Sequence, residues 1–219
     1  GGFSEVGKVH AEKQQGTTKR AIYVVFDNSG SMYGDGNKAW SQATYAMEVF
    51  AAMMNYESGD VMKVFPMHDI TTDGNTGSAT KSSMEIRGKD DIAQIHNMYT
   101  PKPGGTPYTQ VNNAAGELTK LLNAGSVDEG WLVVLTDGDF DNDIPASGLK
   151  ADLEGKAAAN ENLYVQYLAI GTDVKNIPEG NADKGLYAQK AGNTSEVVNE
   201  LAEISNRIFK RNEYAGYSS

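Results

Sequence analysis

An aspartate and two serines follow an apolar run at residues 22–31, and they are the strongest candidates for chemistry in this chain. The stretch reads Ile-Tyr-Val-Val-Phe-Asp27-Asn-Ser29-Gly-Ser31. One carboxylate and two alternately spaced hydroxyls offer hard oxygen ligands, which suit Mg²⁺. An uninterrupted apolar strand is typical of the centre of a parallel sheet, and in open α/β sheets ligands bind beyond the carboxyl ends of such strands.

Two later motifs carry the same kinds of oxygen. Gly104-Gly105-Thr106-Pro107 supplies a hydroxyl, and Asp137 follows a second apolar run at residues 131–135. Alone, an aspartate before serines more often marks a turn or a helix cap. All three motifs in this order resemble the metal-ion-dependent adhesion site (MIDAS) of von Willebrand factor A (vWA) domains, in a bacterial-type form, and the resemblance covers residues 20–210.

The resemblance implies a ligand set and a function. Ser29, Ser31 and Thr106 would contact the cation through their hydroxyls, while Asp27 and Asp137 would hold coordinated waters, or one of them would ligate directly. The expected cation is Mg²⁺, with Mn²⁺ or Ca²⁺ as substitutes. A ligand set so poor in direct carboxylates leaves the metal electrophilic, so that an Asp or Glu of a protein partner completes the shell. The metal then serves binding, and no enzymatic activity is expected.

The elements that must position these residues follow from periodicity. Strands are predicted at residues 20–27, 61–67, 83–87, 131–136, 163–170 and 185–189, and helices at residues 40–54, 90–98, 106–122, 147–159 and 196–210. Alternating strands and helices predict an α/β fold, with a doubly wound, mostly parallel sheet covered by helices on both faces. This is the Rossmann-like architecture that the vWA resemblance also implies.

Local signals refine this plan at three places. The segments 61–67 and 83–87 are joined by a polar loop without a helix, which predicts an antiparallel edge strand. A turn is expected at residues 34–37, and Thr106-Pro107 has the residues of a helix start. We expect a polar lead-in at residues 1–19, one vWA domain at 20–211 and a tail at 212–219.

Composition excludes several classes of partner. The 219 residues carry a formal net charge of −10, which argues against nucleic acid, since its binding needs Lys and Arg. There is no cysteine, so thiolate metal sites are excluded. The longest apolar runs, 21–26 and 131–135, are far shorter than a membrane span, so direct membrane insertion of this segment is not expected.

Three functional hypotheses remain at this stage. The leading one is an adhesion or interaction module of a larger bacterial surface or secreted protein, and hence an extracellular location. The second is a cytoplasmic partner of an AAA+ ATPase in a chelatase-like or cofactor-insertion assembly. The third is a metal-dependent hydrolase, which is disfavoured because a haloacid-dehalogenase-type phosphatase would need its second aspartate where Ser29 stands.

Other polar residues have weaker interpretations. Asp139, Asp141 and Asp143 follow the motif aspartate, but an EF-hand loop would need glycine and glutamate where Asn142 and Gly148 stand. A solvated acidic loop, a second cation site and a role in specificity therefore stay open. The histidines are isolated in sequence and are expected to be surface or core residues, and two tyrosines flank the metal loops and could line a partner surface; these are His10, His68, His96, Tyr33 and Tyr108.

Overall fold

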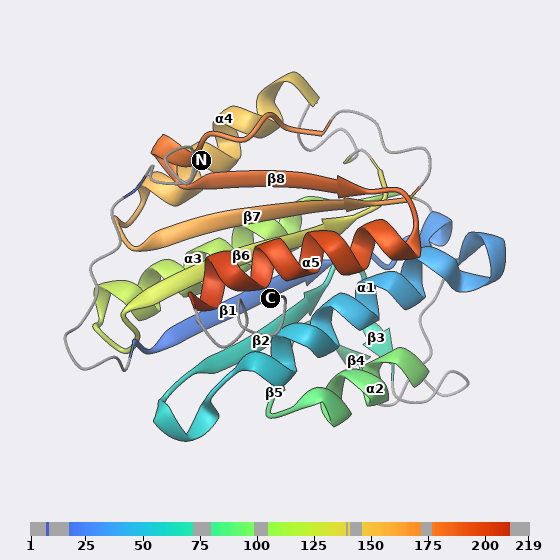
Figure 1. Cartoon of the computed structure of the whole chain (residues 1–219), viewed down its shortest axis with the longest axis horizontal. Coiled ribbons are helices and arrows are strands. Elements are labelled where there is room, and N and C mark those ends of the chain that lie inside the picture. The colour runs from blue at the N-terminus through green and yellow to red at the C-terminus, as the bar shows by residue number, and fades with distance from the viewer. Residues whose placement is uncertain are drawn as a thin grey trace.

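A six-stranded sheet runs through the middle of the molecule in the order β5-β2-β1-β6-β7-β8 (Figure 1). The computed structural model describes residues 8, 18–71, 80–98, 105–138, 140, 146–171 and 177–210. The strands of this sheet are β1 (Arg20–Phe26), β2 (Val61–Pro66), β5 (Met84–Ile86), β6 (Glu129–Thr136), β7 (Leu163–Ile170) and β8 (Leu186–Ala191). All neighbours are parallel except β5, which pairs antiparallel with β2 at one edge, as the sequence predicts.

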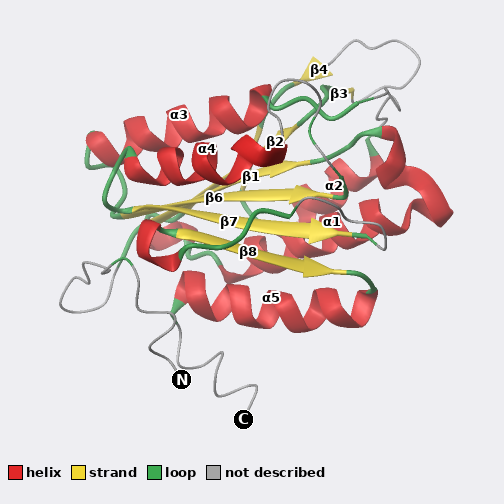
Figure 2. Cartoon of the chain, turned by 90° about the horizontal axis from the view of Figure 1, so that it is seen from above, coloured by secondary structure: helices red, strands yellow, loops and turns green. Residues whose placement is uncertain are grey.

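Helices cover both faces of the sheet (Figure 2). One face carries α3 (Thr109–Asn123) and α4 (Ala146–Ala158), and the other carries α1 (Gly34–Met53), α2 (Lys89–Asn97) and α5 (Thr194–Phe209). Two hydrophobic cores result, one on each face, because successive residues of a strand point to opposite sides. The predicted doubly wound, mostly parallel α/β fold is confirmed.

The pairing of β1 with β6 decides where the candidate ligands lie. Phe26, the last residue of β1, is in register with Leu135 of β6. The next residue of the first strand, Asp27, donates its main-chain N–H to the Leu135 carbonyl at 2.8 Å. Both aspartate motifs therefore leave the centre of the sheet side by side, at the edge where ligands bind in open α/β sheets.

Two helix starts differ from the sequence prediction. The turn expected at residues 34–37 is the first turn of α1, which begins at Gly34. The helix expected at Thr106 begins at Thr109, with Tyr108 as its N-cap. The Tyr108 ring is buried in an edge-to-face contact with Phe140, 4.7 Å between centroids. Its side chain is thereby held in the core before the helix starts, and Thr106 remains in the loop.

The smaller elements lie in the connections. Short 3-10 helices are η2 (Gly30–Tyr33), η3 (Tyr56–Ser58) and η4 (Ala182–Lys184). The predicted polar loop after the second strand contains a small antiparallel pair, β3 (Ile70–Thr71) with β4 (Thr80–Lys81). Residues 72–79 between these two strands lie outside the described residues.

The predicted lead-in and tail are covered only in part. Lys8 of the lead-in lies against the domain, because its Nζ donates to the main-chain carbonyls of Ala157 at 3.0 Å and Leu163 at 2.5 Å. The tail at 212–219 lies outside the described residues, so the domain boundaries stay predictions. Within the described part of the chain, no helix has both the length and the apolar character needed to cross a membrane.

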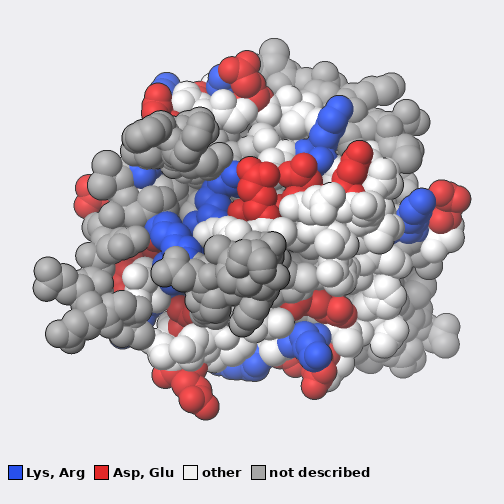
Figure 3. All heavy atoms as spheres, in the orientation of Figure 1, with Lys and Arg blue, Asp and Glu red and all other residues white. Residues whose placement is uncertain are grey.

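Charged side chains are interspersed on the face that carries α5 and α1 (Figure 3). Lysine and arginine side chains lie beside aspartate and glutamate side chains there, and Arg207 of α5 pairs with the exposed Glu203 of the same helix. Such mixing is typical of a solvated surface, where an exposed ion pair contributes little to stability.

Candidate metal centre

Asp27 is held rigidly at the carboxyl end of β1. Its side chain is fully buried, and each carboxylate oxygen accepts a hydrogen bond. Oδ1 accepts from the main-chain N–H of Ser29 at 2.8 Å, and Oδ2 accepts from the Thr136 hydroxyl at 2.7 Å. A carboxylate held at both oxygens has little rotational freedom, so Asp27 is preorganised before any ligand arrives.

The serine hydroxyls extend this cluster towards Asp137. The Oγ atoms of Ser29 and Ser31 are 3.3 Å apart, and Ser31 Oγ donates to Asp137 Oδ1 at 3.0 Å. Ser29 precedes the 3-10 helix η2 and Ser31 lies within it, while Asp137 directly follows β6. Four of the five candidate ligands therefore form one connected group of oxygen atoms.

The electrostatics of this group favour a cation. Partial burial and, next, the negative charge of Asp27 raise the pKa of the Asp137 carboxyl, while the hydrogen bond from Ser31 lowers it; the net result is a pKa of about 6. Two carboxylates that approach each other away from bulk water repel, and a divalent cation between or beside them relieves that repulsion. The donor set thus fits a hard cation.

The described residues contain no group of three or more His, Cys, Asp and Glu side chains that could hold a metal ion. A cation at this position would therefore draw its protein ligands from two carboxylates and from hydroxyls. Such a set suits Mg²⁺, which keeps several waters and binds few carboxylates.

The loop that carries Thr106 is connected to the first loop through His68. The side chain of Thr106 is buried, and this residue follows Gly105, whose φ of +90° lies in the region that favours glycine. The carbonyl oxygen of Gly105 is 3.0 Å from Nε2 of His68, and the main chain of His68 is hydrogen-bonded to Asn28, the residue after Asp27. The expected glycine-dependent turn is present at Gly105, while Gly104 lies outside the described residues.

Sequence reasoning missed three residues of this site. Thr136 holds Asp27, and Asn28 with His68 connects the first loop to the Thr106 loop. Thr136 carried a visible signal, since it is a hydroxyl residue that ends an apolar strand next to Asp137. The signal for His68 was its place two residues after the end of β2, the strand that pairs with β1. His68 is therefore a bridging residue, although isolation in the sequence favoured a surface or core role.

The remaining candidates differ in outcome. Tyr108 does not line a partner surface, since it is buried and its hydroxyl donates to Asp152 at 2.6 Å. Tyr33 packs on Trp40 with ring centroids 5.3 Å apart. His96 is an exposed residue, as expected, and its Nδ1 lies 3.0 Å from the Thr44 hydroxyl. His10, Asp139, Asp141 and Asp143 lie outside the described residues.

A small cavity of about 220 Å³ adjoins the oxygen cluster. Its lining contains two of the candidate ligands together with residues of α1 and of the turns after β7 and β8; these are Ser31, Gly34, Asp35, Lys38, Ala39, Gln42, Asp137, Gly171 and Gly192. Its volume is below the 300–1,000 Å³ of typical small-molecule sites. One or two side chains of a partner would fill it.

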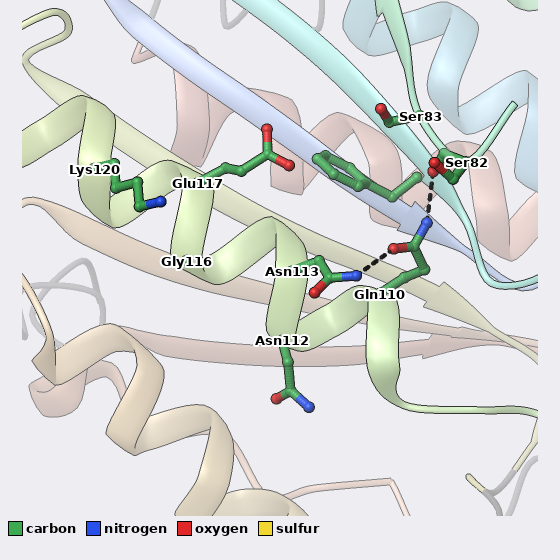
Figure 4. A pocket seen from close by; sticks show the side chains of 9 residues that line it. Ser82, Ser83, Gln110, Asn112, Asn113, Gly116, Glu117 and Lys120 are labelled. Atoms are coloured by element: carbon green, nitrogen blue, oxygen red, sulfur yellow. Dashed lines mark hydrogen bonds between the residues drawn. The ribbon is translucent and has the colours of Figure 1, made fainter.

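A larger hollow of about 370 Å³ lies between α3 and the β2–β5 edge. In Figure 4 the Gln110 amide points to Ser82, while Asn113 points to Gln110. Gln110 also donates to the Pro66 carbonyl at 3.1 Å, and Glu117 is paired with Lys63 at 2.7 Å. These polar groups form their hydrogen bonds and ion pair within the chain. The bonds along the hollow attach α3 to the sheet.

Comparisons with known proteins agree with the fold. No family model matches the chain, and no curated protein sequence matches it. Solved structures do match. An aerotolerance-related membrane protein from Bacteroides fragilis has a TM-score of 0.56 at 12% identity, covering 87% of this chain and 99% of that chain. The pilus adhesin SpaC from Lactobacillus rhamnosus GG has a TM-score of 0.53 at 16% identity, covering 92% and 31%.

A third match is proximal thread matrix protein 1 of the mussel byssus, with a TM-score of 0.55 at 15% identity. It covers 87% of this chain and 48% of the mussel chain, so this chain spans about half the length of that protein. Another structure of the mussel protein has a MIDAS motif occupied by zinc, with a TM-score of 0.52. The chain has the fold of vWA domains, as the sequence motifs predict.

Proposed function

We propose that this chain is a metal-dependent protein-binding module whose metal centre consists of Asp27, Ser29, Ser31, Thr106 and Asp137. The observation that carries the proposal is the continuous chain of hydrogen-bond contacts from Thr136 through Asp27, Ser29 and Ser31 to Asp137. This cluster lies at the carboxyl ends of the two central strands, where open α/β sheets bind ligands. The vWA fold, with a metal-occupied MIDAS in one match, supports the same assignment.

Each residue has a distinct task in this proposal. Ser29, Ser31 and Thr106 offer hydroxyl oxygens to the cation, and Mg²⁺ is the expected physiological ion. Asp27 is held by Ser29 and Thr136, so it presents fixed negative charge from within the protein. Asp137 is half-buried and faces the cavity, so it adds the second carboxylate near the surface.

The partner supplies the last ligand. When bound, the cation supplies an electrophilic centre with a coordination position that the carboxylate of a partner Asp or Glu fills. The adjoining cavity would receive side chains next to that residue, and Lys38 and Asp35 at its wall would contact them. Binding of this kind needs no catalytic residue, and we expect no turnover on ester or phosphoester substrates.

We further propose that the module belongs to a larger bacterial surface or secreted protein. Support comes from the fold that it shares with a pilus adhesin and with a byssus matrix protein. The cytoplasmic alternative, a partner of an AAA+ ATPase, predicts a different binding protein. A pull-down in Mg²⁺ compared with one in EDTA, followed by identification of the Mg²⁺-dependent species, decides between the two.

The metal centre itself is tested by calorimetric titration of Mg²⁺ and Mn²⁺ into the wild type, Asp27→Ala and Thr106→Ala. We expect a single site in the wild type and loss of measurable binding in both variants. Thr119→Ala is a matched control, since its hydroxyl donates to a carbonyl within α3 and faces no candidate ligand. Equal binding by all four proteins would refute the proposed centre.

A further inference from the structure

We propose that His68 is a positioning residue of the metal centre, whose imidazole holds the Gly105–Thr106 loop against the loop that begins at Asp27. The inference rests on the proposed function, because the position of Thr106 matters only if its hydroxyl serves the cation. It adds a residue that neither the MIDAS motif nor the ligand set contains.

The contacts of His68 reach both loops at once. Its main-chain N–H donates to Oδ1 of Asn28 at 2.8 Å, and its carbonyl oxygen accepts from Nδ2 of Asn28 at 2.7 Å. Asn28 is fully buried between Asp27 and Ser29 in the chain. On the other side, Nε2 of the ring lies 3.0 Å from the carbonyl oxygen of Gly105, one residue before Thr106.

The backbone that carries this ring is fixed before it reaches either loop. The preceding residue, Met67, donates its N–H to the Phe26 carbonyl at 3.0 Å, which continues the pairing of β2 with β1. The carbonyl of Pro66 accepts from the amide of Gln110 at the start of α3, the residue that is central in Figure 4. The main chain that carries His68 is therefore held in place by its hydrogen bonds to β1 and α3. These bonds position the imidazole ring within hydrogen-bond distance of Gly105.

The chemistry of the contact assigns the donor. A carbonyl oxygen can only accept, so Nε2 of His68 must carry the hydrogen. Nε2 carries a hydrogen in the Nε2–H tautomer and in the imidazolium form alike, and the contact survives in both. Nε2 of His68 therefore donates its hydrogen bond to the Gly105 carbonyl and is not a metal ligand. His68 positions the loop, and the oxygen ligands bind the metal.

The energetic reason lies in the loop. Gly105 has the conformational freedom of glycine, and a second glycine precedes it, so ordering this segment costs entropy. A hydrogen bond that orders the loop in advance removes this cost from metal binding. Without it, the same ligands would bind the cation more weakly, although none of them has changed.

Three variants of His68 separate this role from general stability. His68→Ala removes the donor but keeps both main-chain bonds to Asn28, because these do not use the ring. His68→Gln places an amide N–H near the position of Nε2, and His68→Phe keeps the ring volume without a donor. For Mg²⁺ binding by calorimetry, we expect roughly a fivefold loss of affinity in the Ala and Phe variants, the usual effect of one hydrogen bond, and substantial recovery in the Gln variant.

His96→Ala is the matched control. His96 also uses a ring nitrogen in a bond, to Thr44, and its ring stacks on Trp40 at 6.1 Å between centroids. These contacts join α1 and α2 and do not involve the metal loops. We expect a lower Tm for this variant with an unchanged Mg²⁺ affinity.

A second readout needs no metal. In EDTA, exchange of the amide hydrogens of Gly105, Thr106 and Tyr108 should be faster in His68→Ala and His68→Phe than in the wild type, and close to wild type in His68→Gln and His96→Ala. Exchange of the β1 and β6 amides reports global stability and should be unchanged in the three His68 variants. This pattern reports the loop directly, even for a variant whose overall stability is lower.

The outcomes are distinguishable. If the wild type binds Mg²⁺ and the Ala and Phe variants bind it equally well, the positioning role is wrong while the proposed function stands. If His68→Gln behaves like His68→Ala in affinity and in exchange, the role of the donor is refuted. If the wild type binds neither Mg²⁺ nor Mn²⁺, the proposed function fails, and the inference with it.

Discussion

At the scale of single residues, the environment of Asp137 raises the pKa of its carboxyl group and so makes metal binding depend on pH. Asp137 is half-buried beside Asp27, and both burial and the neighbouring charge raise the pKa of its carboxyl, to about 6. In the metal-free protein, Asp137 is therefore mostly protonated at pH 5 and mostly ionised at pH 7. A cation must displace that proton, so metal binding and proton binding compete at this residue.

The first prediction is a pH dependence of metal affinity. Between pH 7 and pH 5, Mg²⁺ affinity should fall roughly tenfold, because a proton with a pKa of about 6 occupies Asp137 at the lower pH. Calorimetric titration at pH 5, 6 and 7 measures this. An affinity that stays constant across this range would show that the Asp137 carboxylate does not contribute.

The same pKa gives a stability prediction for the metal-free protein. The pKa of Asp137 in the folded protein lies above the ordinary aspartate value of 3.8, so the folded state binds more protons than the unfolded state between about pH 4 and pH 6. Its contribution to stability therefore decreases as the pH rises through this window. Asp137→Asn removes the charge, and we expect it to lose Mg²⁺ binding while its Tm in EDTA at pH 7.5 equals or exceeds that of the wild type. A Tm clearly below the wild type would contradict this.

At the scale of elements, the attachment of α5 to the sheet depends on a buried polar network. Nη1 of Arg207 donates to the side-chain oxygens of Gln166 in β7 and Gln189 in β8, both at 2.7 Å. The guanidinium also lies over the Tyr187 ring, 4.4 Å from its centroid. Gln166 is fully buried, so its oxygen depends on a partner inside the protein.

We expect Arg207→Ala to lower the free energy of unfolding by about 2–3 kcal/mol, since it leaves buried amide oxygens without their charged donor. Glu203→Ala is the control, because Glu203 is largely exposed and its ion pair with Arg207 should contribute less than about 1 kcal/mol. Mg²⁺ affinity should be the same in both variants, since Arg207 is in the last turn of α5, at the opposite end of the strands from Asp27 (Figure 1). Urea denaturation and calorimetry measure the two quantities; a change in affinity would reveal coupling between α5 and the metal centre.

At the scale of the whole molecule, metal binding should stabilise the fold. The proposed ligands lie after β1, after β6 and in the loop before α3, so a cation held by them would bind the folded state and not the unfolded chain. At a Mg²⁺ concentration 100-fold above Kd, the stabilisation is about 2.7 kcal/mol, which for a domain of this size raises the Tm by roughly 5–10 °C. Scanning calorimetry in Mg²⁺ and in EDTA tests this. Asp27→Ala should show no difference between the two conditions.

Much of the fold can be predicted from the sequence, because apolar runs and helical periodicity are visible within short segments. The strand at Leu163–Ile170 is predicted at its observed bounds, because a short, mostly apolar run with aromatic and β-branched residues favours a buried strand. The start of α3 is displaced to Thr109, because the burial of Tyr108 against Phe140 overrides the preference of Thr106-Pro107 for a helix start. Such a packing contact leaves no trace in the local pattern.

The amino-acid sequence by itself determined the oxygen-bearing residues and their placement after apolar strands, because residue chemistry and strand periodicity are properties of short segments. Only the tertiary structure decided how these segments meet. Thr136 binds Asp27 across 109 positions, Ser31 binds Asp137 across 106, and His68 reaches Gly105 across 37. These contacts depend on the order of strands in the sheet and on side-chain geometry, which no single segment encodes.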